Sequence, residues 1–409
     1  MRETINGAGP AGAANVHGRR VALVSSSYAP YFGGVEEHVR QVARELHEEG
    51  IVVEVWTVDR GTGPVVREID GITVRYLPTP LPSGSPGGVG RFLTAFPGAW
   101  RRWAAARREF RPDLLHVHCF GPNGVYALAM HRRFRLPLVV TSHGETVADD
   151  NAVFERSASL RTGLRRSLAA AEAVTAPSAF VIDELRSRFG LSGGEVVPNG
   201  VDTTLTGDRE RTPFAGRYLL AVGRLGRTKG FDLLVDAFAG SDLEPVLQLV
   251  VIGDGPELAR LHSLVAERGL DGRVVFAGRL DPSAVADAMA GADAVIVPSR
   301  IEAFGIVALE AWRSGSPLVM TNRGGAPGFV RDGIDGILVD PLDTAALRSA
   351  ISRVAEDPDL RSRMVSAGRE RVPEFSWRRV TKAYEGLYAT ALGRAVGAAS
   401  ARGTEASAR

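Results

Sequence analysis

The sequence predicts an α/β protein built from two successive, doubly wound domains. Short apolar runs typical of buried parallel strands alternate with amphipathic segments of helical periodicity. The alternation starts near residue 19 and begins again at Tyr218, after the turn-forming stretch Pro198–Asp202. Several apolar runs also end in glycine-bearing loops that lead into helices, which is where open α/β sheets bind their ligands.

Composition narrows the class of protein. The 409 residues allow two or three domains, and 44% hydrophobic with 23% charged residues is typical of a soluble globular protein. A net charge of +2 and the absence of a Lys/Arg tract argue against a nucleic-acid partner. The single cysteine, Cys119, excludes an intrachain disulfide. Residues 1–18 lack the apolar core of a signal peptide and are expected to be disordered, so we expect a cytoplasmic protein.

The first domain opens with a strand, a Gly-Gly loop and a helix. Arg20–Ser25 reads as a buried strand and Val35–Glu49 as an amphipathic helix, with Gly33 and Gly34 between them. Such a loop can bring backbone amides close to a phosphate, although two glycines are also common in an ordinary turn. The further strands expected in this half are Ile51–Val58, Ile72–Leu77, Asp113–Val117, Leu138–Thr141 and Ala173–Ala176.

Two consecutive segments of this half lie between the expected strands, and the second of them has two possible interpretations. Pro78–Gly90 reads as a mobile loop, and Arg91–Arg111 combines several aromatic residues and arginines with a single acid, Glu109. The latter segment predicts either a helix with its aromatic stripe in the core or a surface that lies on an anionic membrane. The second possibility would place the protein peripherally at the inner face of the membrane.

Histidines follow two of these strands. His116 and His118 lie on one face of a strand next to Cys119, and a structural or site-lining role is favoured over zinc because the sequence shows no other ligand cluster. His143 comes directly after Leu138–Thr141 and before Gly144, so its side chain is expected to point into a crevice or to pack.

The second domain carries a basic strand-to-helix loop. Tyr218–Val222 is followed by Gly223–Gly230, in which Arg224 and Lys229 offer a guanidinium and an ammonium group to a diphosphate. A helix is expected from Phe231. Strands at Leu247–Gly253 and Val274–Phe276 follow, and Arg279 and Leu280 lie just beyond the second of them.

Two glutamates flank a predicted helix start in the same half. Ala294–Val297 predicts a buried strand, and a loop that contains Glu302 leads into a helix over Phe304–Trp312 that carries Glu310. The backbone N–H groups of Phe304, Gly305 and Ile306 would form the helix N-terminus, which favours a bound phosphate. Hydroxyl-binding carboxylates on either side of such a helix end suit a nucleotide sugar.

This stretch resembles the E-x7-E signature of retaining glycosyltransferases of family 4, which have the GT-B fold of two Rossmann-like domains that face each other across a cleft. The residues that carry the resemblance are Glu302, Phe304, Gly305, Glu310, Ala311, Gly315 and Pro317. The G-R-L-x-x-x-K-G element at Gly223–Gly230, the P-N-G-V-D linker at Pro198–Asp202 and the T-x-H-G pattern at His143 appear in the family's order.

The resemblance implies a role for each matching residue. Arg224, Lys229 and the amides of Phe304–Ile306 would hold the donor diphosphate, and Glu310 would bind the ribose hydroxyls. Glu302 would bind the sugar hydroxyls, and His143 would contact the sugar and the acceptor. The Gly33–Gly34 loop would lie over the reaction centre, and Arg279 and Leu280 would neighbour the base. We therefore predict His143, Arg224, Lys229 and Glu302 as the catalytic set, within a larger donor site.

The implied reaction transfers a hexosyl group from a UDP- or GDP-sugar to a sugar, lipid-linked, cyclitol or natural-product acceptor. The leaving phosphate would take the acceptor proton, and the cationic side chains make a metal or other cofactor unnecessary. Two positions depart from the family pattern. Gly324–Gly328 lacks the acid of G-G-x-x-E, which puts donor recognition near Gly325 in doubt, and Ala303 stands where proline or glycine is common.

The domain boundaries follow from these motifs. The acceptor domain is expected at 19–195, the nucleotide-sugar domain at 196–375, a helix that returns to the first domain at 376–393, and a disordered tail at 394–409. Two other functions stay open, namely another enzyme of this fold such as an isomerase or phosphorylase, and a catalytically silent binding subunit. Neither the donor nor the oligomeric state follows from the sequence.

Overall fold

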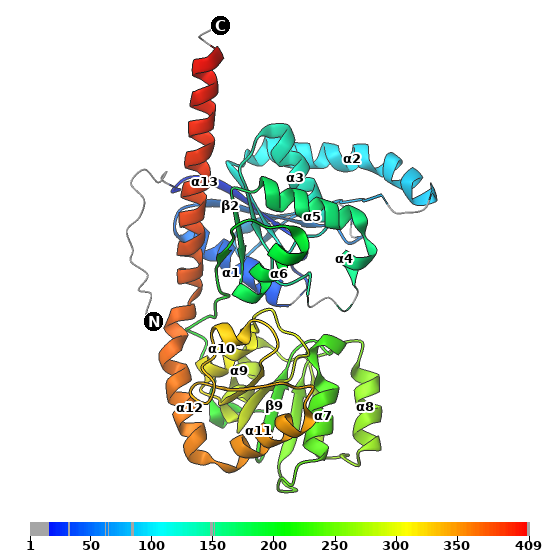
Figure 1. Cartoon of the computed structure of the whole chain (residues 1–409), viewed down its shortest axis with the longest axis vertical. Helices are drawn as coiled ribbons and strands as arrows, with labels where there is room; N and C mark the ends of the chain where they lie inside the picture. The colour runs from blue at the N-terminus through cyan, green and yellow to red at the C-terminus, as the bar shows by residue number, and fades with distance from the viewer. Residues whose placement is uncertain are drawn as a thin grey trace.

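The computed structural model describes residues 16–406 except 32, 62, 64, 83–85, 148, 149 and 151. Two α/β domains lie one above the other, and a long helix runs along both (Figure 1). The prediction of a disordered N-terminus at 1–18 falls almost entirely outside the described residues. Within the described residues no helix is long and apolar enough to cross a membrane.

The first domain contains a sheet of eight described strands in the order β3-β4-β2-β1-β5-β6-β7-β8. Only β3 runs antiparallel to its neighbour, so the rest of the sheet is parallel, as continuous apolar strand sequences require. The strands are β1 (Arg20–Ser25), β2 (Val52–Val58), β3 (Val66–Ile69), β4 (Ile72–Leu77), β5 (Leu114–His118), β6 (Leu138–Thr141), β7 (Ala173–Ala176) and β8 (Glu195–Val196).

Helices cover both faces of this sheet. Successive side chains of β1 point to opposite faces and are apolar on both, so each face must be buried. Val21 and Leu23 pack in the core beneath α1, whereas Ala22 and Val24 belong to the core on the other face. The helices are α1 (Gly34–Glu48), α2 (Pro86–Phe110), α3 (Pro122–Phe134), α4 (Val153–Arg156), α5 (Ala158–Ala170) and α6 (Ala179–Phe189). The first domain is thus doubly wound, as predicted.

The second domain contains a sheet of six described strands in the order β11-β10-β9-β12-β13-β14, with every neighbouring pair parallel. Leu219 and Leu220 of β9 lie in different cores, one on each face of the sheet. The strands are β9 (Tyr218–Val222), β10 (Gln248–Ile252), β11 (Val274–Gly278), β12 (Ala294–Val297), β13 (Leu318–Thr321) and β14 (Ile337–Val339).

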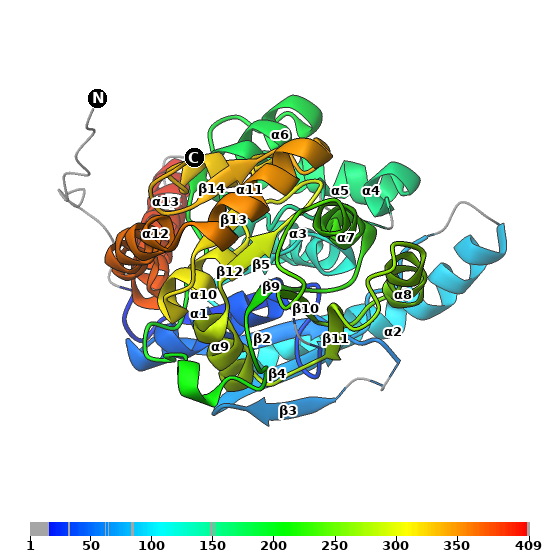
Figure 2. The ribbon, with the colours of Figure 1, turned by 90° about the horizontal axis from the view of Figure 1, so that it is seen from below.

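The helices of the second domain flank this sheet on both sides (Figure 2). They are α7 (Phe231–Ala239), α8 (Leu258–Glu267), α9 (Pro282–Gly291), α10 (Ile306–Ser314), α11 (Thr344–Glu356) and α12 (Pro358–Arg371), and short 3₁₀ turns include η2 (Arg227–Lys229) and η4 (Val372–Phe375). In both domains the loops after the parallel strands gather at one edge of the sheet, where such folds bind their ligands.

The last helix, α13 (Trp377–Ala406), links the two domains. It begins beside the second domain and packs against α1 and β6 of the first (Figure 1). Trp377, Tyr384 and Tyr388 are buried anchors along it, as expected for the first two from the sequence pattern. The prediction of a disordered tail from residue 394 is wrong, because the helix continues to Ala406. Residues 394–406 are rich in Ala, whose helix propensity outweighs the low complexity of the segment.

The segment Pro78–Gly90 is only partly a loop, because α2 already begins at Pro86. Proline fits the first turn of a helix, where its missing N–H would have no partner in any case. Farther along α2, Ala99, Trp103, Ala106 and Phe110 are buried, so the aromatic stripe of this half faces the core. The strand β8 extends the first sheet to Val196, one residue beyond the expected domain boundary.

Candidate active site

The two domains touch where the loop after β6 meets the loop after β12. A Cβ on Gly144 would lie 2.3 Å from the Cβ of Ala303, so the glycine backbone lies directly on that residue. The Ser178 hydroxyl donates to the carbonyl oxygen of Ala303 at 2.6 Å. Because His143 precedes Gly144 and Glu302 precedes Ala303, this contact brings the loops that carry two predicted catalytic residues together from opposite sides of the interdomain cleft.

Glu302 and Lys229 form an ion pair at the base of that cleft. The Lys229 Nζ donates to Glu302 Oε2 at 2.7 Å, and the Ser299 hydroxyl donates to the same oxygen at 3.0 Å. Glu302 is buried, whereas the lysine side chain remains about a third exposed. The backbone of Glu302 is fixed as well, because its N–H donates to Arg323 O and its carbonyl accepts from Gly325 N. A buried carboxylate with one free edge can orient sugar hydroxyls.

Arg224 lies on the loop that follows β9, five residues before Lys229. Its side chain is 57% exposed, and its Nη2 donates to Asp150 Oδ2 at 2.7 Å. The same carboxylate accepts from the backbone N–H of Thr228 at 2.9 Å through Oδ1. Asp150 belongs to the first domain and was not predicted as a site residue. The loop therefore presents an arginine and a backbone donor to one anion.

The helix that carries Glu310 begins later than predicted. α10 starts at Ile306, and Gly305 precedes it with φ 92°, a left-handed conformation that favours glycine. Phe304 lies outside the helix with its ring stacked on Phe329 at 4.3 Å, so its side chain belongs to the core. Of the three predicted amides, only that of Ile306 is on the first helical residue. The first N–H groups of the helix are therefore those of Ile306 and Val307, since the Ala308 N–H already donates to Gly305 O at 3.0 Å.

The glycine loop of the first domain lies over this helix end. A Cβ on Gly34 would be 3.5 Å from Ile306 Cδ1, so the start of α1 packs against the start of α10. Gly33 precedes α1 in an extended conformation, with φ 177°. Two helix N-termini, one from each domain, therefore meet at the cleft. Their partial positive charges favour an anion between them.

Glu310 lies in the second turn of α10. Burial raises the pKa of its carboxyl, Arg313 opposes that rise, and Glu37 of α1 adds to it across the domain boundary. The same burial lowers the pKa of Arg313. A carboxylate in this position can accept two hydrogen bonds from a diol such as a ribose.

Arg279 and Leu280 follow β11, at the far edge of the second sheet. The arginine is 70% exposed and lies 3.7 Å from Asp254, whereas Leu280 packs against the core beside β12. Strands β10 and β9 separate β11 from β12. The two residues thus lie along the same sheet edge as the Lys229–Glu302 pair, with two strands between β11 and β12.

Glu145 is a second residue that the sequence pattern did not reveal. Its carboxylate accepts from Phe120 N and His143 N, each at 2.7 Å, and from the Ser142 hydroxyl at 3.0 Å. It thereby ties the loop after β5 to the loop that carries His143. Burial raises the pKa of this carboxyl and its hydrogen bonds oppose the rise.

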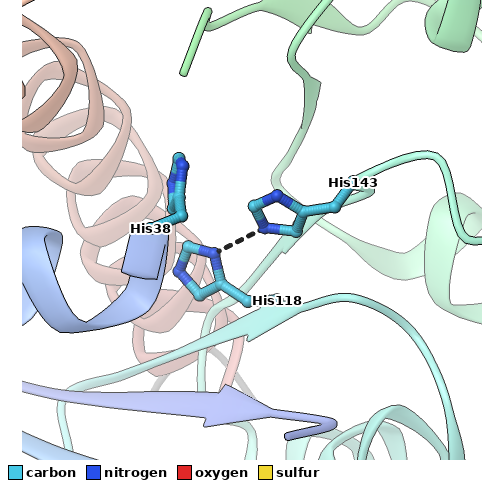
Figure 3. Close-up of side chains that lie close together, drawn as sticks. All are labelled: His38, His118 and His143. Carbon is cyan, nitrogen blue, oxygen red and sulfur yellow. Dashed lines mark hydrogen bonds between the residues drawn. The ribbon is translucent and has the colours of Figure 1, made fainter. Parts of the chain in front are cut away.

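Three histidines cluster beneath the cleft. His38, His118 and His143 have potential ligand atoms within 4.8 Å of one another, which the sequence did not predict because His38 is far away in the chain. Four of their six ring nitrogens already have protein partners: both nitrogens of His38, and one each of His118 and His143. His38 bonds Asn199 and Tyr384, and His118 bonds His143 (Figure 3). Metal binding would have to break these bonds, so we assign the cluster to side-chain orientation.

Comparison with known proteins finds matches to two glycosyltransferase families, one for each domain. The family described as "Glycosyl transferases group 1" matches residues 208–371, and "Glycosyltransferase Family 4" matches residues 32–205. A D-inositol 3-phosphate glycosyltransferase of Acidothermus cellulolyticus is 33% identical, over 94% of this chain and 93% of its own.

Two solved structures have the same architecture. A sucrose-phosphate synthase from Thermosynechococcus elongatus superimposes with a TM-score of 0.78 at 25% identity, over 93% of this chain and all of its own. Anabaena HepE, solved in complex with UDP-glucose, gives 0.70 at 21% identity, over 89% and 97% of the two chains. The second likeness shows the fold alone. The chain therefore belongs to glycosyltransferase family 4 and has the GT-B fold.

Proposed function

We propose that this glycosyltransferase moves a hexosyl group, with retention of configuration and without a metal, from a UDP- or GDP-sugar to a hydroxyl of a cyclitol acceptor. The observation that carries the proposal is the Lys229–Glu302 pair, at 2.7 Å, in a cleft whose opposite wall carries His143. A cation for phosphate and a buried carboxylate for sugar hydroxyls are what a nucleotide sugar needs at neighbouring positions.

The donor would lie along the edge of the second sheet. Arg224, Lys229 and the first amides of α10 bind the diphosphate, and Glu310 accepts hydrogen bonds from the ribose. Arg279 and Leu280, farther along the same edge, border the base. Binding of UDP-glucose by the structural neighbour HepE supports this class of donor, and UDP and GDP remain alternatives here.

In the transfer step, the bond between the anomeric carbon and the phosphate oxygen breaks while the acceptor oxygen bonds the same face of the carbon. The acceptor proton passes to the departing phosphate oxygen. Arg224 and Lys229 stabilise the negative charge that grows on the diphosphate, strengthened by exclusion of water between the domains. Glu302 and His143 hold the sugar ring from opposite walls.

Two side-chain cations on the diphosphate make a divalent ion unnecessary in this scheme. The acceptor would bind at the carboxyl ends of the first sheet, where Arg60 follows β2 and donates to Ser26 O at 3.3 Å. The name of the 33% identical relative, a D-inositol 3-phosphate glycosyltransferase, supports a cyclitol as the acceptor. Sugar, lipid-linked and natural-product acceptors are the alternatives.

The test is thermal unfolding with a panel of UDP- and GDP-sugars, in EDTA and in Mg²⁺, for wild type and Glu310→Gln. A ligand at 100 times its Kd stabilises a protein by about 2.7 kcal/mol, which is a measurable shift in Tm. We expect one nucleotide class to stabilise wild type equally in both buffers and to fail with the variant. Glu370→Gln, an exposed carboxylate on α12, is the matched control and should respond as wild type.

Stabilisation only in Mg²⁺ would reject metal independence, and no stabilisation by any donor would reject the donor class. Transfer and its stereochemistry are then tested with the stabilising donor and a set of cyclitols and cyclitol phosphates. NMR of the product reports the anomeric configuration. An inverted product would contradict the retaining mechanism, and transfer to none of these polyols would contradict the acceptor class.

We further propose that α2 contacts an anionic membrane through the exposed apolar residues of its first half and the exposed arginines along its length. This half projects from the first domain (Figure 1) and exposes Val89, Leu93 and Phe96. Arg91, Arg101, Arg102 and Arg108 are exposed on the same helix. A helix that exposes both apolar side chains and cations fits the boundary between lipid headgroups and acyl chains.

A further inference from the structure

His143 is supported from below by a hydrogen bond to His118. The ring of His143 enters from the loop after β6, and that of His118 from the end of β5 (Figure 3). His118 Nδ1 lies 3.2 Å from His143 Nε2. His118 is fully buried, whereas His143 is only partly buried. A buried imidazole thus holds the inner nitrogen of the ring that faces the proposed donor sugar.

Other aromatic rings pack around both histidines. The ring of His116 packs against that of His118 at a tilt, with centroids 3.9 Å apart, and its nitrogens bond Tyr388 Oη and Thr141 Oγ1 at 2.7 Å each. His38 packs edge-on against His143 with centroids 4.6 Å apart.

His38 is itself fixed. Its Nδ1 bonds Asn199 Oδ1 at 2.9 Å, and its Nε2 bonds the Tyr384 hydroxyl at 3.0 Å. Both ring nitrogens of His38 are therefore in use, and His118 is the histidine that forms the hydrogen bond to His143.

The hydrogen bonds indicate which nitrogen of each ring carries the proton. His118 Nε2 is buried and has no hydrogen-bond partner among the described residues. A buried N–H without an acceptor is rarer in proteins than an unfilled lone pair, so the proton belongs on Nδ1. His118 Nδ1–H then donates to His143 Nε2, and His143 must carry its own proton on Nδ1 if it is neutral.

Burial keeps this pair neutral. It lowers the pKa of His118 and of His143 well below the ordinary value, and the nearby histidines lower it further. Neither ring therefore gains the second proton that would turn the acceptor nitrogen of His143 into a donor and break the bond.

We propose that His118 is a positioning residue, which fixes His143 as its Nδ1–H tautomer and thereby leaves an N–H donor for a hydroxyl oxygen of the donor sugar. The proposal rests on the function proposed above, in which His143 contacts that sugar. His118 itself touches no substrate. It acts only through the orientation and tautomer of His143.

The test compares His118→Asn with His118→Phe. The amide nitrogen of asparagine branches from Cγ as Nδ1 does, so the first variant keeps a donor in the same place, whereas phenylalanine keeps a ring without a donor. We expect kcat/KM within about threefold of wild type for the asparagine variant and a loss of about 10- to 100-fold for the phenylalanine variant. The loss should fall mainly on kcat, because the positioning matters most at the transition state.

His116→Phe is the matched control, since it alters the next ring along β5 but makes no bond to His143. It should change the unfolding temperature with less than about a threefold change in kcat/KM, because its effect is on packing. Equal losses for the asparagine and phenylalanine variants of His118, or wild-type kinetics for both, would overturn the proposal.

A second measurement does not depend on activity. ¹⁵N spectra of histidine-labelled wild-type protein distinguish a ring protonated on Nδ1 from one protonated on Nε2. We expect His143, assigned by its absence from His143→Gln, to be protonated on Nδ1 near neutral pH. Protonation on Nε2 would refute the inference. Protonation on Nδ1 together with full transfer by His143→Gln would instead refute the role of His143 in the proposed function.

Discussion

The carboxylate of Asp150 and the guanidinium of Arg224 form an ion pair across the cleft, with Oδ2 and Nη2 2.7 Å apart. The other carboxylate oxygen accepts from Thr228 N at 2.9 Å. A Cβ on Gly226 would lie 2.3 Å from Oδ2, so the absence of a side chain there allows the close approach. An acidic group of the first domain thus occupies Arg224, one of the donors that the proposed diphosphate needs.

Asp150→Asn should tighten the binding of the donor nucleotide. If the Asp150 carboxylate is paired with Arg224 for about 70 to 90% of the time, the apparent Kd for the nucleotide is about three- to tenfold higher than that of the unpaired site. Removal of the negative charge should lower the Kd by the same factor. Titration calorimetry with UDP and GDP measures the change. Glu155→Gln, which breaks a surface ion pair with Arg188 in the same domain, is the control and should leave the Kd unchanged. Weaker binding by Asp150→Asn would mean that the carboxylate organises Arg224 rather than competing with the diphosphate.

Lys229→Met should reduce kcat/KM by about 10²- to 10³-fold, because it removes one charged donor from the departing diphosphate. The chain's other lysine, Lys382, offers a matched control on the surface of α13, where it bonds Glu49 and Glu385. Lys382→Met should change kcat/KM by less than about twofold, since exposed ion pairs contribute little. Steady-state kinetics on both variants decide this, and similar losses for the two lysines would contradict the assignment.

Gly144→Ala should separate the domains. Gly144 has φ 89°, and a Cβ there would meet Ala303 at 2.3 Å across the cleft. We expect a destabilisation of about 1–3 kcal/mol from backbone strain and at least a tenfold loss of kcat/KM from the displaced wall. Urea unfolding and kinetics measure the two effects. Gly386→Ala, where a Cβ meets nothing within 4 Å, should be neutral or slightly stabilising. Unchanged kinetics in Gly144→Ala would mean that the cleft adjusts without cost.

The sequence predicted the parts of the fold that depend on local patterns. Strands such as Arg20–Ser25 and Tyr218–Val222 have the predicted bounds because a continuous apolar run between turn residues is distinctive. β3 and β14 were missed because they are short, and β3 lacks buried residues. The end of α13 was missed because the low complexity of its sequence predicts disorder, whereas its alanine content favours a helix.

The residues of the candidate site also divide into those that a local sequence motif marks and those that depend on a distant partner. Glu302 and Lys229 were found because a spaced motif marks each of them, and the structure brings them into contact. Asp150, Glu145 and His38 were missed because each acts through a partner that is distant in the chain or on another loop. In the sequence, Asp150 is marked only by the acid before it in the loop beyond His143, and nothing there points to Arg224.

Stability should fall as the pH drops below about 6.5, because four neutral histidines are packed together. Burial lowers the pKa of His38 to about 4, and those of His116, His118 and His143 well below the ordinary value. Between the folded and unfolded pKa values the unfolded chain binds more protons, so acid favours unfolding. His38 alone contributes on the order of 3 kcal/mol across that window.

The raised pKa values of Glu145 and Glu310 act in the opposite direction, since their folded forms gain protons first as the pH falls. A variant therefore isolates the histidine effect. Urea unfolding of His116→Asn from pH 7.5 to 5 should show a slope flatter than that of wild type by up to about 1.4 kcal/mol per pH unit. The same slope in both proteins would show that His116 is protonated in the folded state.

Sedimentation with liposomes tests the membrane surface of α2. Each exposed arginine near an anionic bilayer contributes about 1 kcal/mol, so neutralising three of them should weaken binding about 100-fold. Arg107 is left in place because its guanidinium lies over the Phe134 ring at 4.6 Å. The variant changes Arg101, Arg102 and Arg108 to Gln, and the control with equal charge loss changes Arg353, Arg363 and Arg379, which are also exposed.

Leu93→Ser adds the apolar half of this test, because Leu93 is 64% exposed and its replacement should weaken binding without changing the charge. Binding should also fall with added salt, since surface charges are screened over about 8 Å at 0.15 M. If the α2 and control arginine variants lose binding equally, the attraction is to net charge and not to α2. If wild type fails to sediment with anionic liposomes, the exposed face of α2 serves another purpose and the acceptor need not be bound to a lipid.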